Sequence, residues 1–245
     1  MMDETFAMLD LETTGQKAGC RVLTAGLVFA IPRQGIISEN YWRIRLPEQF
    51  DMGLDDDAST IKWWREEAGE EARTEAWGDG EDRIALPFVL AGISQAMQMW
   101  NHKSVWCHGV GFDFNILEAA YVKAGLRHMI PWHFRQLNDT RSIYKLTGVS
   151  PAKVPGQYHK ALDDARNQSL ALIEALKLLA SQGLATLQPA LPDELRTPEA
   201  TPSTLEEVTQ RLTEAKLAED SEELEAGTFA ESPPVVAAEA PKTEA

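Results

Sequence analysis

The first third of the chain carries the apolar patterns of β-strands. Residues 5–11 alternate between polar and apolar, and residues 21–31 form a long, β-branched run. Gly35 then supplies a turn before a third such run at residues 36–46. Apolar segments of this length are typical of strands, and short links between them favour antiparallel pairing. We therefore predict a three-stranded antiparallel meander.

Beyond the third strand the spacing becomes helical, interrupted by one short strand at residues 103–109. Ser59 can cap the first helix, Pro87 lies near the start of the third, and Gly125 closes the fourth. The expected helices cover residues 60–68, 70–77, 86–100, 112–126, 139–148 and 160–181. Residues 150–157 contain two prolines and a glycine, so they are expected to form a loop. This order of elements indicates an α/β fold with a mixed sheet.

The composition changes at about residue 188, where Pro, Ala, Glu and Thr become dominant. We expect a folded domain over residues 1–187 and an acidic tail over residues 188–245 that is mostly disordered or loosely helical. Ser203 and Glu206 could form a capping box within this tail. The net charge is −15, of which −10 falls in the tail. This acidic balance argues against a broad basic surface that binds nucleic-acid phosphates, but it is compatible with nucleic acid held through metal ions.

The two cysteines, Cys20 and Cys107, have neither zinc-binding spacing nor the pattern of a disulfide framework. Reduced thiols in a cytosolic protein are therefore expected. The N-terminus has no basic region before an apolar run, and no apolar run approaches the ~18–20 residues of a membrane span. Together these observations predict a cytoplasmic protein without a signal peptide.

The stretch MLDLETTG, residues 8–15, brings two acids together on the first strand. Side chains two residues apart share a face of a strand, so Asp10 and Glu12 point the same way. Leu9 and Leu11 point to the other face and anchor the strand. Adjacent carboxylates on a buried strand repel unless a cation lies between them, and such hard oxygen ligands suit Mg²⁺ or Mn²⁺. The alternative is a strand that simply runs out into a polar turn.

A third acid, Asp113, follows a short strand that breaks at Gly109 and Gly111. It falls in the first turn of an expected helix, where the helix dipole favours a carboxylate. That favourable local charge is one explanation for Asp113, and a role in a site is the other.

The stretch YHKALDDARNQ, residues 158–168, places His159 shortly before two adjacent aspartates at the start of the last helix. When the helix is projected at ~100° per residue, Asp163 falls about 150° from the centre of the apolar face. Asp164 falls about 110° from it, on the flank. A flank residue can reach a cleft beside the sheet, whereas its neighbour faces water. The alternative is the ordinary polar start of a surface helix.

Taken together, D-x-E on a first strand, an aspartate after a glycine break and H-x₄-D at a late helix resemble the DEDDh branch of the DnaQ-like 3′→5′ exonucleases. The family's spacing selects Asp164 rather than Asp163, in agreement with the helical projection. The segments STIKWWREEAGEEAR and NDTRSIY resemble an exonuclease VIII-like group of bacterial and phage 3′→5′ exoribonucleases. The resemblance covers about residues 4–182. One departure is that Gly109 follows His108 where many relatives have asparagine, which leaves the substrate subtype open.

The resemblance implies a ribonuclease H-like mixed sheet and two-metal hydrolysis of phosphodiester bonds that releases 5′-nucleotides. The implied ligands of two divalent cations, Mg²⁺ or Mn²⁺, are Asp10, Glu12, Asp113 and Asp164. Asp10 would bridge both ions. His159 would accept a proton from the attacking water, since an imidazole titrates near neutral pH.

The resemblance also implies substrate contacts. The backbone near Leu11 and the Thr13 side chain are candidates for holding the terminal nucleotide, and Phe112 could stack on a base or pack in the core. Trp63 and Trp64 are adjacent, so both cannot face the core from one helix. The expected partner is the 3′ end of single-stranded nucleic acid, DNA or RNA. A homodimer, a protein partner for the acidic tail and a non-catalytic binding module on the same fold remain open.

Overall fold

The fold is taken from a computed structural model, which describes residues 2–80, 82–152, 159–184 and 210. Contacts divide the chain into two units, Met1–Thr201 and Pro202–Ala245, and every helix and strand below belongs to the first. Apart from Gln210, the predicted tail lies outside the described residues, as do its capping box and most of the predicted loop before the last helix. The boundary between domain and tail therefore stays a prediction.

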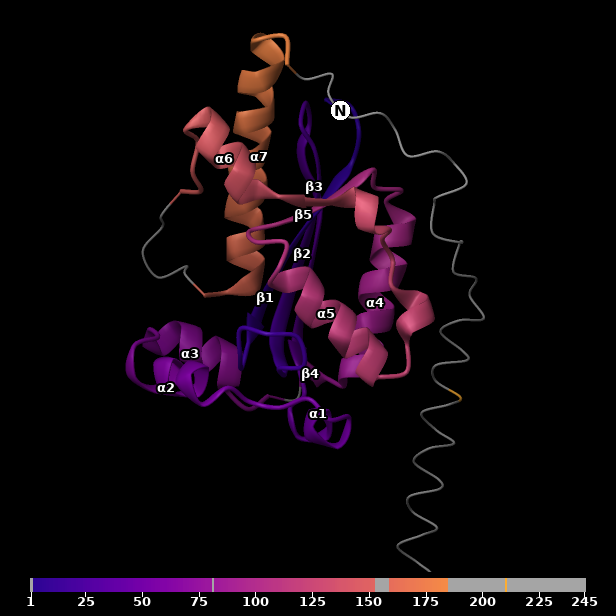
Figure 1. The fold of residues 1–245 in the computed structure, drawn as a ribbon, viewed down its shortest axis with the longest axis vertical. Helices are drawn as coiled ribbons and strands as arrows, with labels where there is room; N and C mark the ends of the chain where they lie inside the picture. Colours follow the sequence, from indigo (N-terminus) through magenta and orange to yellow (C-terminus); the bar gives the residue numbers. More distant parts are fainter. Residues whose placement is uncertain (1, 81, 153–158, 185–209, 211–245) are drawn as a thin grey trace, which may run out of the picture. The chain divides into compact units, whose positions relative to one another are not determined.

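A six-stranded mixed sheet forms the centre of the first unit (Figure 1). Its strands are β1 Phe6–Thr13, β2 Val22–Ile31, β3 Gly35–Ile44, β4 Arg83–Ile84, β5 Ser104–Cys107 and β6 Leu137–Asp139, in the order β4-β3-β2-β1-β5-β6. Strands β1 to β3 form the predicted antiparallel meander. Strand β5 pairs parallel to β1, and β6 pairs parallel to β5. The predicted α/β class with a mixed sheet is confirmed.

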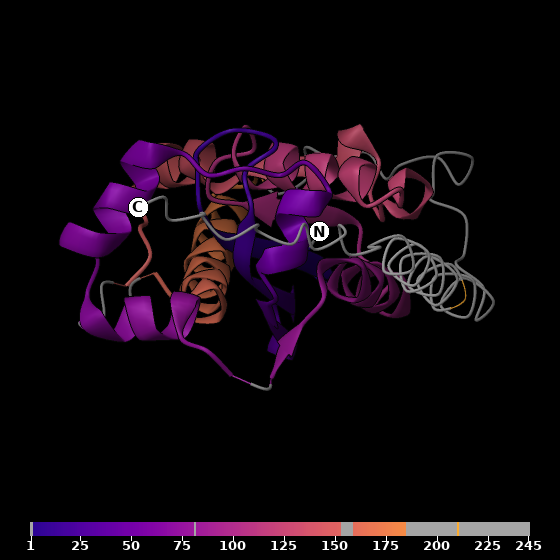
Figure 2. The ribbon, with the colours of Figure 1, turned by 90° about the horizontal axis from the view of Figure 1, so that it is seen from below.

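Helices cover both faces of this sheet (Figures 1 and 2). Their bounds are α4 Leu86–Met99, α5 Asp113–Lys123, α6 Thr140–Thr147 and α7 Ala161–Ser181, with short 3-10 turns at Arg127–Met129 and Phe134–Gln136. Helices α6 and α7 lie on one side, while α4 and α5 lie on the other. Between α7 and the sheet, Phe6, Met8 and Val28 pack with Leu172 and Leu176. Burial on both faces is typical of a sheet with parallel strands. None of the described helices is long and apolar enough to cross a membrane.

Three short helices, α1 Pro47–Asp51, α2 Ala58–Glu66 and α3 Glu70–Trp77, link β3 to β4. Helix α2 begins after Asp57, whose carboxylate accepts a hydrogen bond from the Thr60 N–H at 2.9 Å. The prediction that Ser59 caps this helix was wrong, because Asp57 has the extended backbone that aims a side chain at the free N–H groups of the first turn. Trp64 attaches α2 to the sheet, since its Nε1–H donates to the Thr13 carbonyl at 2.9 Å.

The first turn of α7 lies directly on strand β2 at Gly26, which pairs with Asp10 across the β1–β2 ladder. A methyl group at Gly26 would come within 2.3 Å of the Ala161 carbonyl oxygen and 2.6 Å of the Leu162 nitrogen. Only a residue without a side chain allows the helix backbone to approach a strand this closely. The contact therefore places Asp164, in the same turn, beside Asp10.

The substitution Gly26→Ala should push the first turn of α7 away from β2. Overpacking of this kind typically costs about 1–3 kcal/mol of unfolding free energy. The shift should also separate Asp164 from Asp10 and weaken binding of a divalent cation. Urea unfolding and calorimetric titration with Mn²⁺ would measure the two effects. Gly111→Ala is the matched control, because a methyl group there meets nothing within 4 Å, and equal effects of the two substitutions would contradict the close contact.

Candidate active site

Two carboxylates of β1 and one of α7 converge. Asp10 and Glu12 lie two residues apart on β1, while Leu9 and Leu11 are buried and anchor the strand. One carboxylate oxygen from each of Asp10, Glu12 and Asp164 lies within 4.8 Å of the others. Glu12 is only 8% exposed, so this part of the group is largely removed from solvent. The structure thus joins residues that are more than 150 positions apart in the sequence.

The two adjacent aspartates of α7 have different surroundings. Asp164 faces the acids of β1. Asp163 instead forms an ion pair with Arg166, whose Nε also donates to Glu39 of β3 at 2.7 Å. This agrees with the helical projection, which placed Asp164 on the flank of the apolar face and Asp163 toward solvent. The structure therefore places Asp164, and not Asp163, in the acidic group.

Asp113 is the first residue of α5 and is only 3% exposed. Its Oδ1 accepts a hydrogen bond from the backbone N–H of Leu11 at 3.1 Å, and the thiol of Cys107 donates to the same carboxylate. Asp113 is not one of the three acids within 4.8 Å of one another, yet its charge acts on both Asp10 and Glu12. A buried carboxylate tied to the strand between those two acids is more than a surface charge at a helix start.

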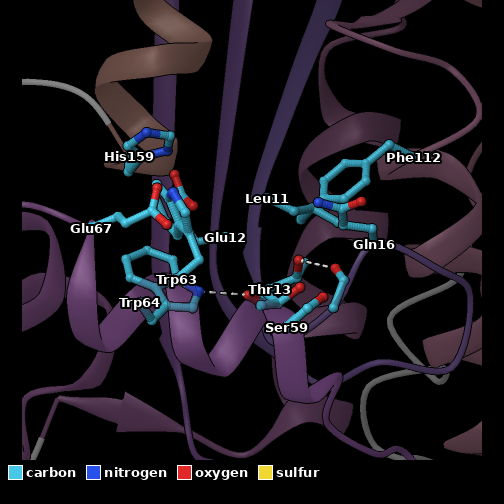
Figure 3. A pocket seen from close by; sticks show the side chains of 12 residues that line it. Leu11, Glu12, Thr13, Gln16, Ser59, Trp63, Trp64, Glu67, Phe112 and His159 are labelled. Atoms are coloured by element: carbon cyan, nitrogen blue, oxygen red, sulfur yellow. Dashed lines mark hydrogen bonds between the residues drawn. The ribbon is translucent and has the colours of Figure 1, made fainter.

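His159 precedes α7 in the left-handed backbone conformation, with φ +60°, which is uncommon for a residue other than glycine. Its backbone N–H donates to Asp164 Oδ2 at 2.9 Å. Its exposed imidazole packs edge-on against Trp63, with ring centroids 4.7 Å apart. The hydrogen bond and the ring contact together place the imidazole at the acidic group, above Glu12 in Figure 3.

A pocket of about 440 Å³ opens beside these acids (Figure 3). Trp63, Glu67 and His159 line one side of it, and Phe112 lies on the opposite side above Leu11. The remaining lining residues come from the end of β1, the following turn and α2 and are Glu12, Thr13, Gly15, Gln16, Ser59, Thr60 and Trp64. A volume of this size suits a small ligand.

The adjacent tryptophans of α2 divide between core and pocket. Trp64 is 2% exposed and packs against Leu23, so it is chiefly a core residue. Trp63 is only partly buried and presents its ring to the pocket and to His159. Trp63 is thus the better placed of the two to meet a ligand.

The three predicted substrate-binding residues, Leu11, Thr13 and Phe112, all line the pocket. Two of them also have partners within the protein. The Leu11 N–H donates to Asp113, and the Thr13 hydroxyl donates to the Gly15 carbonyl at 2.6 Å. Phe112 is only partly buried at the residue before α5, so its ring belongs to the pocket rather than to the core.

Burial and the charges of neighbouring acids raise the pKa values of Asp10 and Glu12. For Asp10, burial raises the pKa well above its usual value, and the charges of the three other acids raise it further. The pKa of Glu12 is raised for the same reasons, with burial the largest. Burial raises the pKa of Asp113 to about 7, although hydrogen bonds to its carboxylate oppose this rise. Carboxylates that resist ionisation in this way are stabilised in their charged form when a divalent cation is bound.

The donor set fits a hard divalent cation. Asp10, Glu12 and Asp164 together offer carboxylate oxygens at a separation that one ion could span. This group, as drawn from the described residues, contains no thiolate or imidazole, and all-oxygen ligation suits Mg²⁺ or Mn²⁺.

Gln168 contributes to the acidic group and was missed by sequence reasoning. Its Nε2–H donates to Asp10 Oδ1 at 2.8 Å, and the side chain is largely buried. The hydrogen bond lowers the pKa of Asp10 and so favours its ionised form. Gln168 lies one helical turn after Asp164, a spacing that puts both on one face of α7. That spacing was the available signal, but a glutamine on a helix has no chemistry of its own to draw attention to it.

In the absence of metal, the stability of the protein should fall as the pH rises from about 5 to about 8. The folded-state pKa values of these acids are raised above their ordinary values, so the stability they contribute is present at low pH. It is lost as the pH rises through the raised values, about 7 for Asp113. Urea unfolding in EDTA at several pH values would measure this trend.

Two controls isolate the acids. Asp10→Asn should flatten the pH dependence, because it removes one charge from the group, and saturating Mg²⁺ should do the same. A free energy of unfolding that rises over this pH range in EDTA, in both the unmodified protein and the variant, would show that the repulsion is absent.

Solved structures with the same fold include exonuclease I. A complex of E. coli exonuclease I with a dT13 oligonucleotide is 12% identical and has a TM-score of 0.52, covering 74% of this chain and 43% of that chain. An exonuclease I structure discussed for its processivity is 16% identical, with a TM-score of 0.50 and coverage of 73% and 41%. A zinc-bound E. coli exonuclease I–single-stranded DNA complex is 12% identical, with a TM-score of 0.50 and coverage of 74% and 41%. This chain thus spans about two fifths of the length of those proteins, and the likeness shows a shared fold.

Comparison with curated protein sequences gives no significant match. The Rv2179c-like 3′-5′ exoribonuclease domain model matches residues 5–176, which is most of the chain. The match includes all four acids and His159, and it agrees with the DnaQ-like resemblance predicted from the sequence. The chain belongs to the family of Rv2179c-like 3′-5′ exoribonuclease domains.

Proposed function

We propose that the protein is a metal-dependent 3′→5′ exonuclease that removes nucleotides from the 3′ end of a single strand. The observation that carries this proposal is the convergence of three carboxylates within 4.8 Å of one another beside a pocket of about 440 Å³. The acids would hold the phosphate at the metal site while the pocket receives the terminal nucleotide. Membership of the exoribonuclease domain family supports the same activity.

Two divalent cations bound by the four acids would supply Lewis acidity that stabilises negative charge on the phosphate and on the leaving oxygen. Asp10 is assigned to both ions by the resemblance to DnaQ-like exonucleases, and its carboxylate lies within 4.8 Å of those of Glu12 and Asp164. Glu12 and Asp164 would complete one site, and Asp113 would serve the other largely through water. Magnesium is the proposed ion, with manganese as a substitute.

The protein's own contribution is to hold these ligands in place before substrate arrives. The Leu11 N–H orients Asp113, and the His159 N–H orients Asp164. His159 would then accept the proton of the attacking water through its imidazole, which is exposed beside the acids.

The pocket is proposed to bind the 3′-terminal nucleotide between its two walls. Phe112 and Trp63 lie on opposite sides and offer aromatic faces, and stacking of a base on such a ring is worth about 1–3 kcal/mol. Leu11 and Thr13 form the floor of the pocket between them. Contacts of this kind do not depend on base identity, as an enzyme that shortens a strand stepwise requires.

The comparisons favour different polymers. The family model describes exoribonucleases, whereas the exonuclease I structures contain DNA oligonucleotides. We propose that the site accepts the 3′ end of either polymer. We further propose a cytoplasmic location and a catalytic domain that ends near residue 187, before the acidic tail.

A nuclease assay with 5′-labelled single-stranded DNA and RNA tests this proposal. With Mg²⁺ or Mn²⁺, the purified protein should produce a ladder that shortens from the 3′ end, and EDTA should stop it. Asp10→Ala should abolish the ladder, because the carboxylate at the centre of the acidic group is lost. If the unmodified protein cuts neither polymer with either metal, the exonuclease proposal fails.

The same assay tests the histidine. His159→Ala should slow cleavage by about 10²–10⁴-fold, the usual contribution of a general base, while Mn²⁺ still binds in a calorimetric titration. A variant that keeps full activity would remove His159 from the mechanism.

The adjacent aspartates provide a matched pair of variants. Asp164→Asn should abolish cleavage, because it replaces a carboxylate of the acidic group. Asp163→Asn should leave most activity, because it alters only the surface ion pair with Arg166. Single-turnover cleavage rates would measure both, and a comparable loss in the two variants would contradict the assignment.

A further inference from the structure

The guanidinium of Arg141 occupies the space that a side chain at position 109 would fill. The loop between β5 and α5 turns through Gly109, which has φ +130° and is buried. A methyl group at Gly109 would lie 3.0 Å from the Arg141 Cζ and Nη1 atoms. Gly109 is thus required both by its backbone conformation and by the arginine beside it.

Asp139 fixes the position from which Arg141 extends. Its Oδ1 accepts the Arg141 N–H at 2.8 Å, and its Oδ2 accepts the Val110 N–H at 3.2 Å. One carboxylate therefore joins the start of α6 to the loop that leads into Asp113. This link accounts for the closeness of the arginine to Gly109.

The charge of Arg141 is available to a ligand. The residue is exposed, and no carboxylate in the described parts of the chain forms an ion pair with its guanidinium. Arg21, Arg43 and Arg166, by contrast, all pair with carboxylates. Its positive charge is felt at Asp113 and at His108. An exposed cation beside a group of acids, in a chain of net charge −15, is suited to an anionic ligand.

We propose that Arg141 binds a backbone phosphate of the nucleic-acid strand upstream of the scissile bond. This inference rests on the proposed exonuclease function. Arg141 does not line the pocket assigned to the terminal nucleotide but lies beside the loop that leads to Asp113. A strand that enters the site from this side would present a phosphate to the guanidinium, whose planar fork matches phosphate oxygens. The arginine would thus select substrates longer than one nucleotide.

Salt dependence of binding tests the proposal directly. Binding of a fluorescein-labelled single-stranded DNA would be followed by anisotropy between about 50 and 200 mM KCl, with Ca²⁺ replacing Mg²⁺. Arg141→Ala should weaken binding and reduce the slope of log K against log salt by about 0.7, as expected for the loss of one phosphate contact. Arg141→Lys should keep the slope but bind more weakly, since it retains the charge without the fork.

Arg33→Ala is the matched control, because Arg33 is 66% exposed and lies in the β2–β3 turn, at the opposite end of β1 from Glu12. It should keep the slope of the unmodified protein. An Arg141→Ala slope equal to that of the control would overturn the proposal, as would failure of the unmodified protein to bind the oligonucleotide. Thermal unfolding of each variant would show that the fold is kept.

A comparison of two substrates separates phosphate binding from a structural role. Thymidine 5′-p-nitrophenyl phosphate has only the phosphate to be cleaved, whereas an oligonucleotide also has upstream phosphates. Arg141→Ala should reduce kcat/KM for the oligonucleotide at least about tenfold more than for the ester, mainly through KM. Equal losses on both would overturn the upstream contact. If the unmodified protein binds the oligonucleotide through Arg141 but does not cleave it, only the exonuclease function is refuted. If the protein cleaves the oligonucleotide but Arg141→Ala leaves the salt slope of binding unchanged, only the role of Arg141 is refuted.

Discussion

The close contact between the first turn of α7 and Gly26 of β2 is the constraint on which the candidate site depends. Gly26 pairs with Asp10, so the point where the helix lies on the sheet is next to the central carboxylate. The same turn carries Asp164, and His159 precedes it with its N–H bound to that aspartate. A helix held farther from the sheet would carry both residues away from β1. The positions of Asp164 and His159 beside β1 therefore follow from this one close approach of the α7 backbone to the β2 backbone.

The fold brings these acids together although their carboxylate charges repel one another and burial disfavours ionisation. The charges of Glu12, Asp113 and Asp164 raise the pKa of Asp10, and a hydrogen bond from Gln168 opposes this rise. Packing on both faces of the sheet supplies the rigidity that keeps them in place. The proposed divalent cations would remove this repulsion, so the arrangement that is unfavourable in the metal-free protein would suit the metal-bound one. The positive charge of Arg141 acts on Asp113, and in our proposal it also binds a phosphate of the strand.

Much of this architecture could be predicted from the sequence, because it is encoded locally. Alternation along β1 placed Asp10 and Glu12 on one face, and helical periodicity distinguished Asp164 from Asp163. The meander and each major helix followed from apolar spacing and from turn residues. Local patterns also produced an error at the start of α2, where Asp57 and Ser59 could both serve as the cap and the backbone of Asp57 decided between them. They did not predict the short strands β4 and β6 or the helix α1.

The remaining features depend on contacts between distant parts of the chain. Nothing near Gly26 in the sequence shows that α7 will rest on it. The role of Gln168 appears only in its hydrogen bond to Asp10. Which of Trp63 and Trp64 faces the core depends on how α2 packs against Thr13. The relation between Gly109 and Arg141 likewise joins the loop after β5 to the first turn of α6. Contacts of this kind can be identified only in the three-dimensional structure, because they produce no periodic pattern in the sequence.

The central claim is that the four acids form a binding site for divalent cations beside a nucleotide pocket. A crystal structure of the protein soaked with Mn²⁺ and a 5′-nucleotide, with anomalous scattering used to locate the metal, tests it most directly. We predict manganese bound by Asp10, Glu12 and Asp164, a second ion on the side of Asp113, and the nucleotide between Trp63 and Phe112. An acidic group that binds no manganese at saturating concentration, or a nucleotide bound elsewhere, would contradict the claim.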